Sequence, residues 1–120
     1  MRKFMLIVRA DLERMRNIPE DKRFADWPDM RKWVNDLARS GIHLSGAPLA
    51  VKGAYVSTND VLHDGPFIES NECIIGYDLV SVENMEHAVS IAQSCPMVMR
   101  GLVVREVRPI LFPESFDGDL

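Results

Sequence analysis

Residues 73–80, with the sequence CIIGYDLV, limit the possible folds of this chain more than any other stretch. In a β-strand, successive side chains point to opposite faces of the sheet. Only Asp78 breaks an apolar pattern here, and each large apolar side chain left in water costs about 1.5–3 kcal/mol relative to burial. Both faces of the predicted sheet therefore need a cover. One face would carry Cys73, Ile75, Tyr77 and Leu79, and the other Ile74, Gly76, Asp78 and Val80.

The remaining strands are predicted from short apolar runs. Residues 3–9, KFMLIVR, are almost continuously apolar and are typical of a central strand. Further strands are expected at 43–49, 54–58 and 103–110, with a turn at Asn59-Asp60 and a return strand from Val61. Residues 11–26 have mixed charges and no clean period, so we expect a loop, either a solvated connection or a pocket lid.

Two helices are predicted, each with one apolar face. The first has Asp26 as its cap and Pro28 in its first turn, and it ends at Gly41. The second has Ser81 as its cap and ends at Cys95-Pro96. The apolar faces consist of Met30, Trp33, Val34, Leu37 and Ala38 in the first helix, and of Met85, Ala88, Val89 and Ala92 in the second.

This order of elements predicts an α+β fold, the ferredoxin-like βαββαβ arrangement with an extra hairpin on an antiparallel sheet. The length of 120 residues fits one domain that spans 1–120. Both helices would cover the same face of the sheet. A second copy of the chain would cover the other face, so we predict a homodimer that joins two sheets face to face.

Composition and charge exclude several classes of partner. The net charge is −4, with Lys and Arg mixed among the acids, so the basic surface needed for binding nucleic acid is missing. The apolar run at residues 4–8 is too short for a signal peptide, and no stretch reaches the roughly 18 apolar residues of a membrane span. We therefore expect a cytoplasmic protein with no membrane contact.

No cofactor and no metal is expected. The sequence has no Gly-rich phosphate loop, nucleotide fingerprint or Ser-His-Asp order. The three histidines lack the spacing of metal ligands. Cys73 and Cys95 are expected to be buried free thiols, because nothing in the sequence pairs either with a base.

The turn at residues 63–72, HDGPFIESNE, brings a histidine and three acids together. Asp64 before glycine can fix the turn through its own backbone, or it can act as a catalytic carboxylate with Phe67 as an apolar wall. His63 is either a surface histidine or a proton carrier, and adjacent residues point to opposite faces, so it is a poor direct partner for Asp64. Glu69 and Glu72 are either solvated or acceptors for a hydroxylated ligand.

Two charges in the apolar strands form a second candidate. A charge inside an apolar strand is costly unless it is paired. If the strand of Asp78 neighbours the last strand, Arg108 could pair with Asp78 or hold a carboxylate ligand. Arg108 precedes Pro109 at a strand end, where a side chain can reach a cleft.

Several motifs follow one another in a specific order: DGPF at 64–67, Glu69 and Glu72, GYDLV at 76–80, Cys95-Pro96, and EVRP at 106–109. Together they resemble the YCII-related family, specifically its DGPF-domain branch, over most of the chain. The resemblance implies a dimeric α/β barrel. Some YCII-like relatives are small-molecule lyases or dehydrochlorinases that use a His–Asp pair. Others are fused to, or encoded beside, extracytoplasmic-function sigma factors.

The chain departs from these relatives at two places. The enzyme-like relatives carry their histidine on the first helix, but residues 30–37 contain none. His43, just beyond that helix, is not an obvious replacement. The DGPF motif carries over onto residues 64–67, and Glu69 matches the acid that follows the motif. The Thr-Lys that usually comes after this acid is Ser70-Asn71 here, which removes a positive charge from the turn.

Two functions are therefore predicted as alternatives. The first is a cofactor-free small-molecule-binding protein, an enzyme of the lyase or isomerase kind. Asp64 would be its acid/base, Arg108 would hold a substrate carboxylate or enolate, and Tyr77 or His63 would donate a hydrogen bond, with Glu69 and Phe67 also binding the ligand. The second is a non-enzymatic accessory or regulatory module that contacts a sigma factor.

Overall fold

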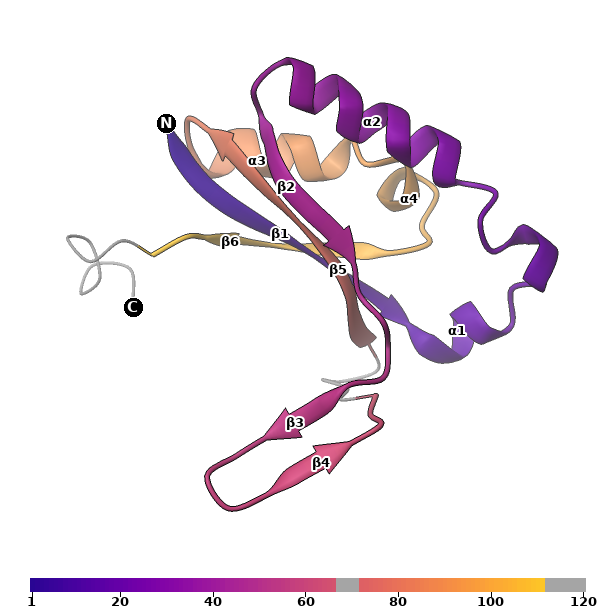
Figure 1. Cartoon of the computed structure of the whole chain (residues 1–120). Helices are drawn as coiled ribbons and strands as arrows, with labels where there is room; N and C mark the ends of the chain where they lie inside the picture. Colours follow the sequence, from indigo (N-terminus) through magenta and orange to yellow (C-terminus); the bar gives the residue numbers. More distant parts are fainter. Residues whose placement is uncertain (67–71, 112–120) are drawn as a thin grey trace.

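The structure, a computed structural model, describes residues 1–66 and 72–111 (Figure 1). The chain begins with a long strand and a short helix, and three further α-helices follow among the described residues. The elements are β1 (Arg2–Asp11), α1 (Leu12–Arg16), a 3₁₀ turn (Glu20–Lys22), α2 (Trp27–Arg39), β2 (His43–Pro48), β3 (Ala54–Val56), β4 (Val61–His63), β5 (Glu72–Val82), α3 (Met85–Gln93), α4 (Pro96–Met99) and β6 (Val104–Pro109).

The sheet confirms the predicted fold class. Its four strands run antiparallel in the order β2-β5-β1-β6. Without the separate β3–β4 hairpin, this is the ferredoxin-like βαββαβ arrangement, with the first and third of its four strands in the centre. The hairpin is an insertion between β2 and β5.

The core lies between one face of the sheet and the helices. Phe4 and Leu6 of β1 and Val80 and Val82 of β5 are fully buried there, against Ala88 and Ala92 of α3. We call this side the helix-facing side of the sheet. Small residues on α3 allow the helix to approach the strands closely, which explains why this part of the core needs no large helix side chains.

A bulge changes the alternation predicted for β5. The register shifts between Val8 and Arg9, so that Val8 lies opposite Gly76 while Arg9 lies opposite Ile74, and Ile75 has no opposite residue on β1. Cys73 is therefore buried on the helix-facing side beside Ala10, not on the face of Tyr77 as strict alternation predicted. A bulge of one residue shifts every side chain beyond it to the opposite face.

The helix boundaries are close to the prediction, but the caps differ. Asn84, not Ser81, caps α3, because β5 continues to Val82; the Asn84 side chain accepts a hydrogen bond from the His87 N–H at 2.8 Å. Asp26 makes no capping bond and instead forms an ion pair with Arg100. Gly41 ends α2 in the left-handed conformation, as predicted, with a φ of 75°.

The predicted apolar faces of the helices are only partly buried. Ala38, Met85 and Val89 belong to those faces by sequence spacing but are exposed. Residues 11–26, predicted as a loop, contain the five-residue α1, where the Asp11 side chain accepts from the Arg14 N–H at 3.2 Å, and the 3₁₀ turn. A short helix of this kind has too few turns to show a periodic apolar pattern.

The second face of the sheet, which we call the open sheet face, is apolar at its centre. Neither α2 nor α3 covers it in the described part of the chain. Glu106 lies on this face and accepts hydrogen bonds from Arg108 Nη1 and Arg9 Nε, both at 2.9 Å. These bonds, Arg108 first, hold the pKa of Glu106 below its ordinary value. The apolar residues of the face are Met5, Ile7, Ile74, Tyr77, Leu79 and Val104.

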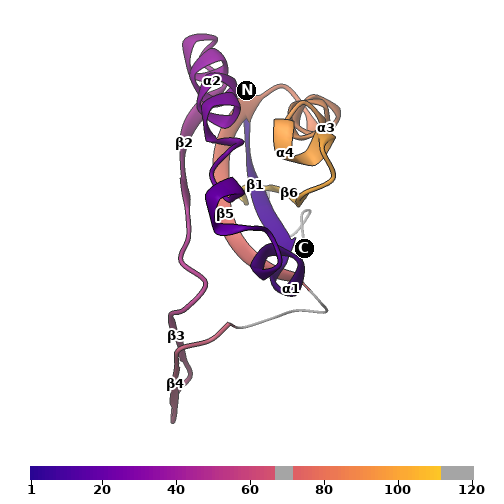
Figure 2. The ribbon, with the colours of Figure 1, turned by 90° about the vertical axis from the view of Figure 1, so that its right-hand side faces the viewer.

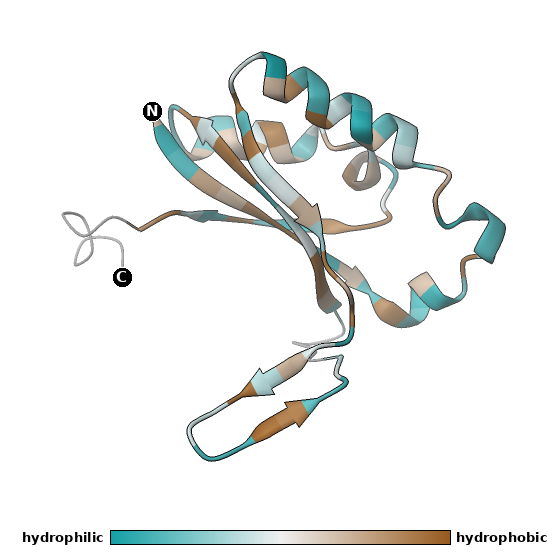
Figure 3. Ribbon diagram, viewed as in Figure 1, coloured by the Kyte–Doolittle hydropathy of each residue, from teal (hydrophilic) through white to brown (hydrophobic). Residues whose placement is uncertain are grey.

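The β3–β4 hairpin extends away from the layer of helices and is seen clear of the sheet in two views (Figures 1 and 2). All six of its strand residues are exposed. Val56 is 71% exposed and Tyr55 57%, and β4 is largely hydrophobic along its length (Figure 3). A two-stranded hairpin alone is marginally stable in water, so this hairpin is suited to contact with another surface.

Candidate functional site

Asp78 is a charged residue that is buried within the sheet. It lies on β5 between Gly76 and Val80, on the helix-facing side of the sheet. Its side chain is 12% exposed. Removing a carboxylate from water is expensive unless partners replace the lost hydration, so the surroundings of Asp78 decide what the residue can do.

Two basic side chains share the carboxylate of Asp78. The Nε2 atom of His43, the first residue of β2, lies 2.6 Å from Asp78 Oδ1. The Nη1 atom of Arg105, on β6, donates to Asp78 Oδ2 at 2.6 Å. The His43 side chain is 8% exposed and that of Arg105 2%. We call these three residues the buried triad.

The order of the strands brings the triad together across the sheet. Asp78 lies opposite Leu6, and Arg105 lies opposite Val8, two residues further along β1. Arg105 therefore reaches over β1 to the carboxylate, and its Nη1 also donates to the carbonyl oxygen of Leu6 at 3.4 Å. His43 completes the group from the neighbouring edge strand.

Gly46 makes room for the carboxylate. It lies on β2 directly opposite Asp78. A Cβ atom at this position would lie 2.4 Å from Asp78 Oδ1 and 2.7 Å from the Tyr77 carbonyl oxygen. Both distances are far below van der Waals contact, so a side chain at Gly46 would displace either the carboxylate or the strand.

Trp33 of α2 covers the triad from the helix layer. Its ring centroid lies 5.0 Å from Arg105 Cζ, within the range of a cation–π contact. The indole Nε1 donates to the Ser94 hydroxyl at 2.9 Å, and that hydroxyl donates to the Ile91 carbonyl at 2.6 Å. The ring is therefore held in place at both its face and its N–H.

The His43–Asp78 contact is suited to proton transfer. A carboxylate only accepts hydrogen bonds, so Nε2 carries the proton in this contact, and Nδ1 keeps a free lone pair when the ring is neutral. The carboxylate also stabilises the imidazolium that forms when Nδ1 takes a proton. Burial of an ion pair contributes little net stability compared with apolar side chains of similar volume, so the buried triad is a candidate functional site.

The prediction that Arg108 pairs with Asp78 is wrong. The strands of the two residues are separated by β1, and Arg108 lies opposite Met5 on the open sheet face. There it forms its ion pair with Glu106, and its side chain is 66% exposed. Tyr77 also lies on the open sheet face, opposite Ile7, so alternation separates both residues from the buried triad.

Asp64, Gly65 and Pro66, the described residues of the DGPF motif, directly follow β4. His63 is the last residue of β4 and is exposed. Asp64 has a φ of 75°, and its N–H donates to the Gly53 carbonyl oxygen at 2.8 Å. An aspartate tolerates this left-handed conformation better than most residues, which favours its role in the turn. Phe67 and Glu69 lie outside the described residues.

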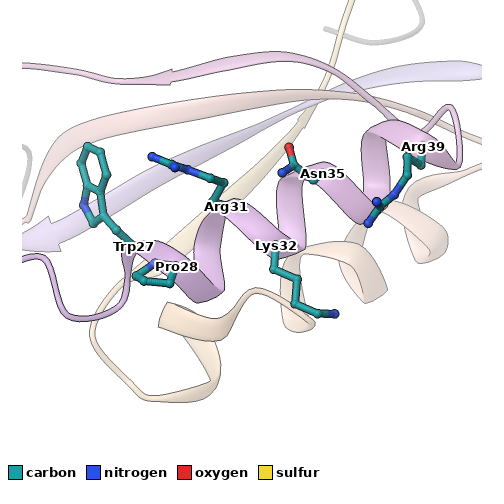
Figure 4. Close-up of a pocket in the computed structure, with 6 residues that line it drawn as sticks. All are labelled: Trp27, Pro28, Arg31, Lys32, Asn35 and Arg39. Atoms are coloured by element: carbon teal, nitrogen blue, oxygen red, sulfur yellow. The ribbon is translucent and has the colours of Figure 1, made fainter.

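Two hollows border α2, and the lining of neither includes a residue of the buried triad. One, of about 400 Å³, lies along a face of the helix with Trp27, Arg31 and Arg39 among its lining residues (Figure 4). The other, of about 570 Å³, lies between α2 and α4, and Trp33 forms part of its lining. We call the second hollow the α2–α4 groove; its remaining lining residues are Asp29, Lys32, Asp36, Pro96, Met99 and Arg100.

In the part of the chain that the structure describes, no three His, Cys, Asp or Glu side chains gather closely enough to hold a metal ion. The helices described are all too short or too polar to cross a membrane. Cys73 and Cys95 are buried free thiols.

Sequence reasoning identified Asp78 but missed both of its partners. His43 stands at a strand start, and its distance from Asp78 in the chain hides the contact. Arg105 and Arg108 lie three residues apart on one strand, so they point to opposite faces, and only the register shows which one faces the helices. One rule could have indicated these partners: a buried carboxylate on a strand needs a cation on the same face of the sheet.

Comparison with known proteins agrees with this fold. The model of the YCII-related domain matches residues 3–111. No curated protein matches the chain. The chain is similar in structure to 5-chloro-2-hydroxyhydroquinone dehydrochlorinase from Burkholderia phenoliruptrix AC1100, in complex with 2,5-dihydroxybenzoquinone, with a TM-score of 0.59, 12% sequence identity, and coverage of 94% of this chain and 97% of that chain. At this identity, the similarity shows a shared fold.

Proposed function

The chain belongs to the YCII-related family, and from that premise we propose that it is a cofactor-free enzyme of the lyase or isomerase kind that acts on a small molecule. His43 is the proposed general base, and Asp78 orients its ring. The observation that carries the proposal is the buried 2.6 Å contact between His43 Nε2 and Asp78 Oδ1. A structural neighbour that is a dehydrochlorinase supports the same class of reaction.

Replacement of His43 tests the proposal directly. A positioned general base contributes about 10²–10⁴-fold in rate. Once a panel of halogenated hydroquinones and enolisable acids has yielded a substrate, His43→Gln is expected to lower kcat by a factor in that range. His87→Gln, on α3, is the matched control and is expected to retain the parental kcat. Equal kcat values for the two variants would remove His43 from the chemistry.

The alternative site, with Asp64 as acid/base and His63, Tyr77 and Arg108 as helpers, stays a prediction. The same assay separates it from the buried triad, because Asp64→Asn should erase most turnover if the DGPF turn carries the reaction. Phe67 and Glu69 would then be the further ligand contacts.

A homodimer is part of the proposal. The open sheet face carries six apolar residues, and a two-fold axis brings the same surface of two copies together. Leu79→Lys would place two like charges in this interface, one from each copy. We expect its dimer dissociation constant, measured by sedimentation equilibrium, to rise at least about 100-fold, since each of the two copies loses a buried side chain that contributes about 1.5–3 kcal/mol.

Val89→Lys, on the outside of α3, is the control for this substitution and should leave the association unchanged. A parent protein that is monomeric at micromolar concentration would contradict the proposed interface.

A second candidate function is protein contact without catalysis. The exposed apolar hairpin favours it, because the side chains of four of its residues are exposed: Tyr55, Val56, Val61 and Leu62. A sigma factor, the partner that the family resemblance suggests, would then bind at the hairpin. This function predicts that His43→Gln binds the sigma factor as the parent protein does, whereas loss of the hairpin side chains abolishes the binding.

A further inference from the structure

We propose that Arg105 is the residue that recognises the ligand, by binding an anionic oxygen of a small molecule next to His43. The inference rests on the proposed function of the buried triad and adds to it the class of compound. The compound is an oxyanion or forms one during the reaction: a carboxylate, a phenolate or an enolate.

The first argument is an unused donor. Arg105 Nε is buried and has no hydrogen-bond partner among the described residues. A buried donor without a partner costs about 1–3 kcal/mol, and more when it carries charge. Native proteins keep few such groups, and each needs an explanation in the function of the site or in a bound molecule. An acceptor oxygen of a ligand would satisfy Nε.

The second argument is the balance of charge. The triad has one carboxylate and two basic groups. When His43 Nδ1 takes a proton from an O–H or C–H bond of the ligand, the bonding electron pair stays on the ligand and makes it an anion. The triad then has a net charge of one positive unit, with Arg105 within the same group of contacts. The charge formed on the ligand therefore appears beside a fixed cation, which stabilises it in a site shielded from water.

The third argument is a route into the triad. Trp33 lies over Arg105 and also lines the α2–α4 groove, whose volume of about 570 Å³ is within the range of small-molecule sites. Movement of the ring would break the hydrogen bond from Nε1 to Ser94 and the contact of the ring face with Arg105. The acids of the groove are already paired, Asp29 with Arg100 and Asp36 with Lys32, so they repel an incoming anion less than free carboxylates would.

The test compares two ligands of one shape that differ in charge. Gentisate carries a carboxylate, and gentisamide carries a neutral amide on the same dihydroxylated ring. Calorimetric titration of the full-length protein is expected to give a dissociation constant for gentisate at least about tenfold below that for gentisamide. In the Trp27→Phe variant, Trp33 is the one remaining tryptophan, and its indole N–H signal in NMR should shift on addition of gentisate.

Variants assign the charge preference to Arg105. Arg105→Lys keeps the positive charge but removes Nε, so its affinity for gentisate should fall several-fold toward that for gentisamide. Arg31→Gln, on the exposed face of α2, should bind gentisate as the parent does. If Arg105→Lys does not fold, equal affinity of the unaltered protein for the two ligands would still overturn the proposal, and so would loss of the preference in Arg31→Gln.

The outcomes separate the two proposals. Equal affinity for gentisate and gentisamide, with both lost in His43→Gln, overturns the role of Arg105 and leaves the His43–Asp78 proposal standing. A preference for gentisate that persists in Arg105→Lys and disappears in Arg31→Gln also overturns it. Binding of neither compound at millimolar concentration contradicts both the role of Arg105 and the proposed small-molecule site.

Discussion

Replacing Asp78 by alanine is expected to destabilise the protein by about 3–5 kcal/mol. The reason is the charge left behind: the Arg105 side chain is 2% exposed and would lose its ionic partner without gaining access to water. His43 would lose its partner as well. The loss is measured as a lower free energy of unfolding in urea at neutral pH.

Two control variants test whether the loss of stability in Asp78→Ala comes from the unpaired charge. Asp36→Ala removes a carboxylate that is paired at the surface with Lys32 and Arg39, and its effect should be much smaller because solvent screens such pairs. The double variant Asp78→Leu with Arg105→Met replaces both charges by apolar side chains and should recover most of the loss. A cost for Asp78→Ala no larger than that for Asp36→Ala would mean that Arg105 finds another partner or water.

Gly46→Ala is expected to destabilise the protein by about 1–3 kcal/mol, the usual cost of overpacking. The added Cβ would meet Asp78 Oδ1 at 2.4 Å and the Tyr77 carbonyl oxygen at 2.7 Å, and the second of these belongs to the backbone of a neighbouring strand. Edge strand β2 would have to move, and His43 with it. Urea unfolding measures the cost, and the NMR signals of the His43 ring report the change at the triad.

Gly53→Ala is the matched control for this prediction. A Cβ at Gly53 meets nothing within 4 Å, so the substitution adds a methyl group without a clash. If Gly46→Ala were as stable as Gly53→Ala and kept the His43 signals in place, the carboxylate of Asp78 would not depend on the space at Gly46.

The fold was largely predictable, because it depends on patterns that are local in sequence. The apolar runs of β1 and β5, the proline and glycine at the ends of α2 and the turn at Asn59-Asp60 each indicate one element. Their order then permits few arrangements. Two of the features that escaped prediction, the Ile75 bulge and the Asn84 cap, change a boundary or a face without changing the local composition.

The candidate site was less predictable, because it depends on register between strands that are distant in sequence. Asp78 stood out as a single charge in an apolar strand, but three elements besides its own supply its surroundings: His43 from β2, Arg105 from β6 and Trp33 from α2. The DGPF motif, in contrast, is conspicuous in the sequence, and its described residues, 64–66, follow an exposed strand of the hairpin.

Tyr77 and Asp78 are neighbours in the chain, yet they serve opposite sides of the sheet. Association of two subunits through the open sheet face would leave the buried triad, on the other side of the sheet, complete within each chain. Each subunit could then take up a molecule without altering how the pair is held together, and the two sites of a pair would work independently. A change that tilts β5, however, would move both the open sheet face and the buried triad, since β5 contributes Tyr77 to the first and Asp78 to the second.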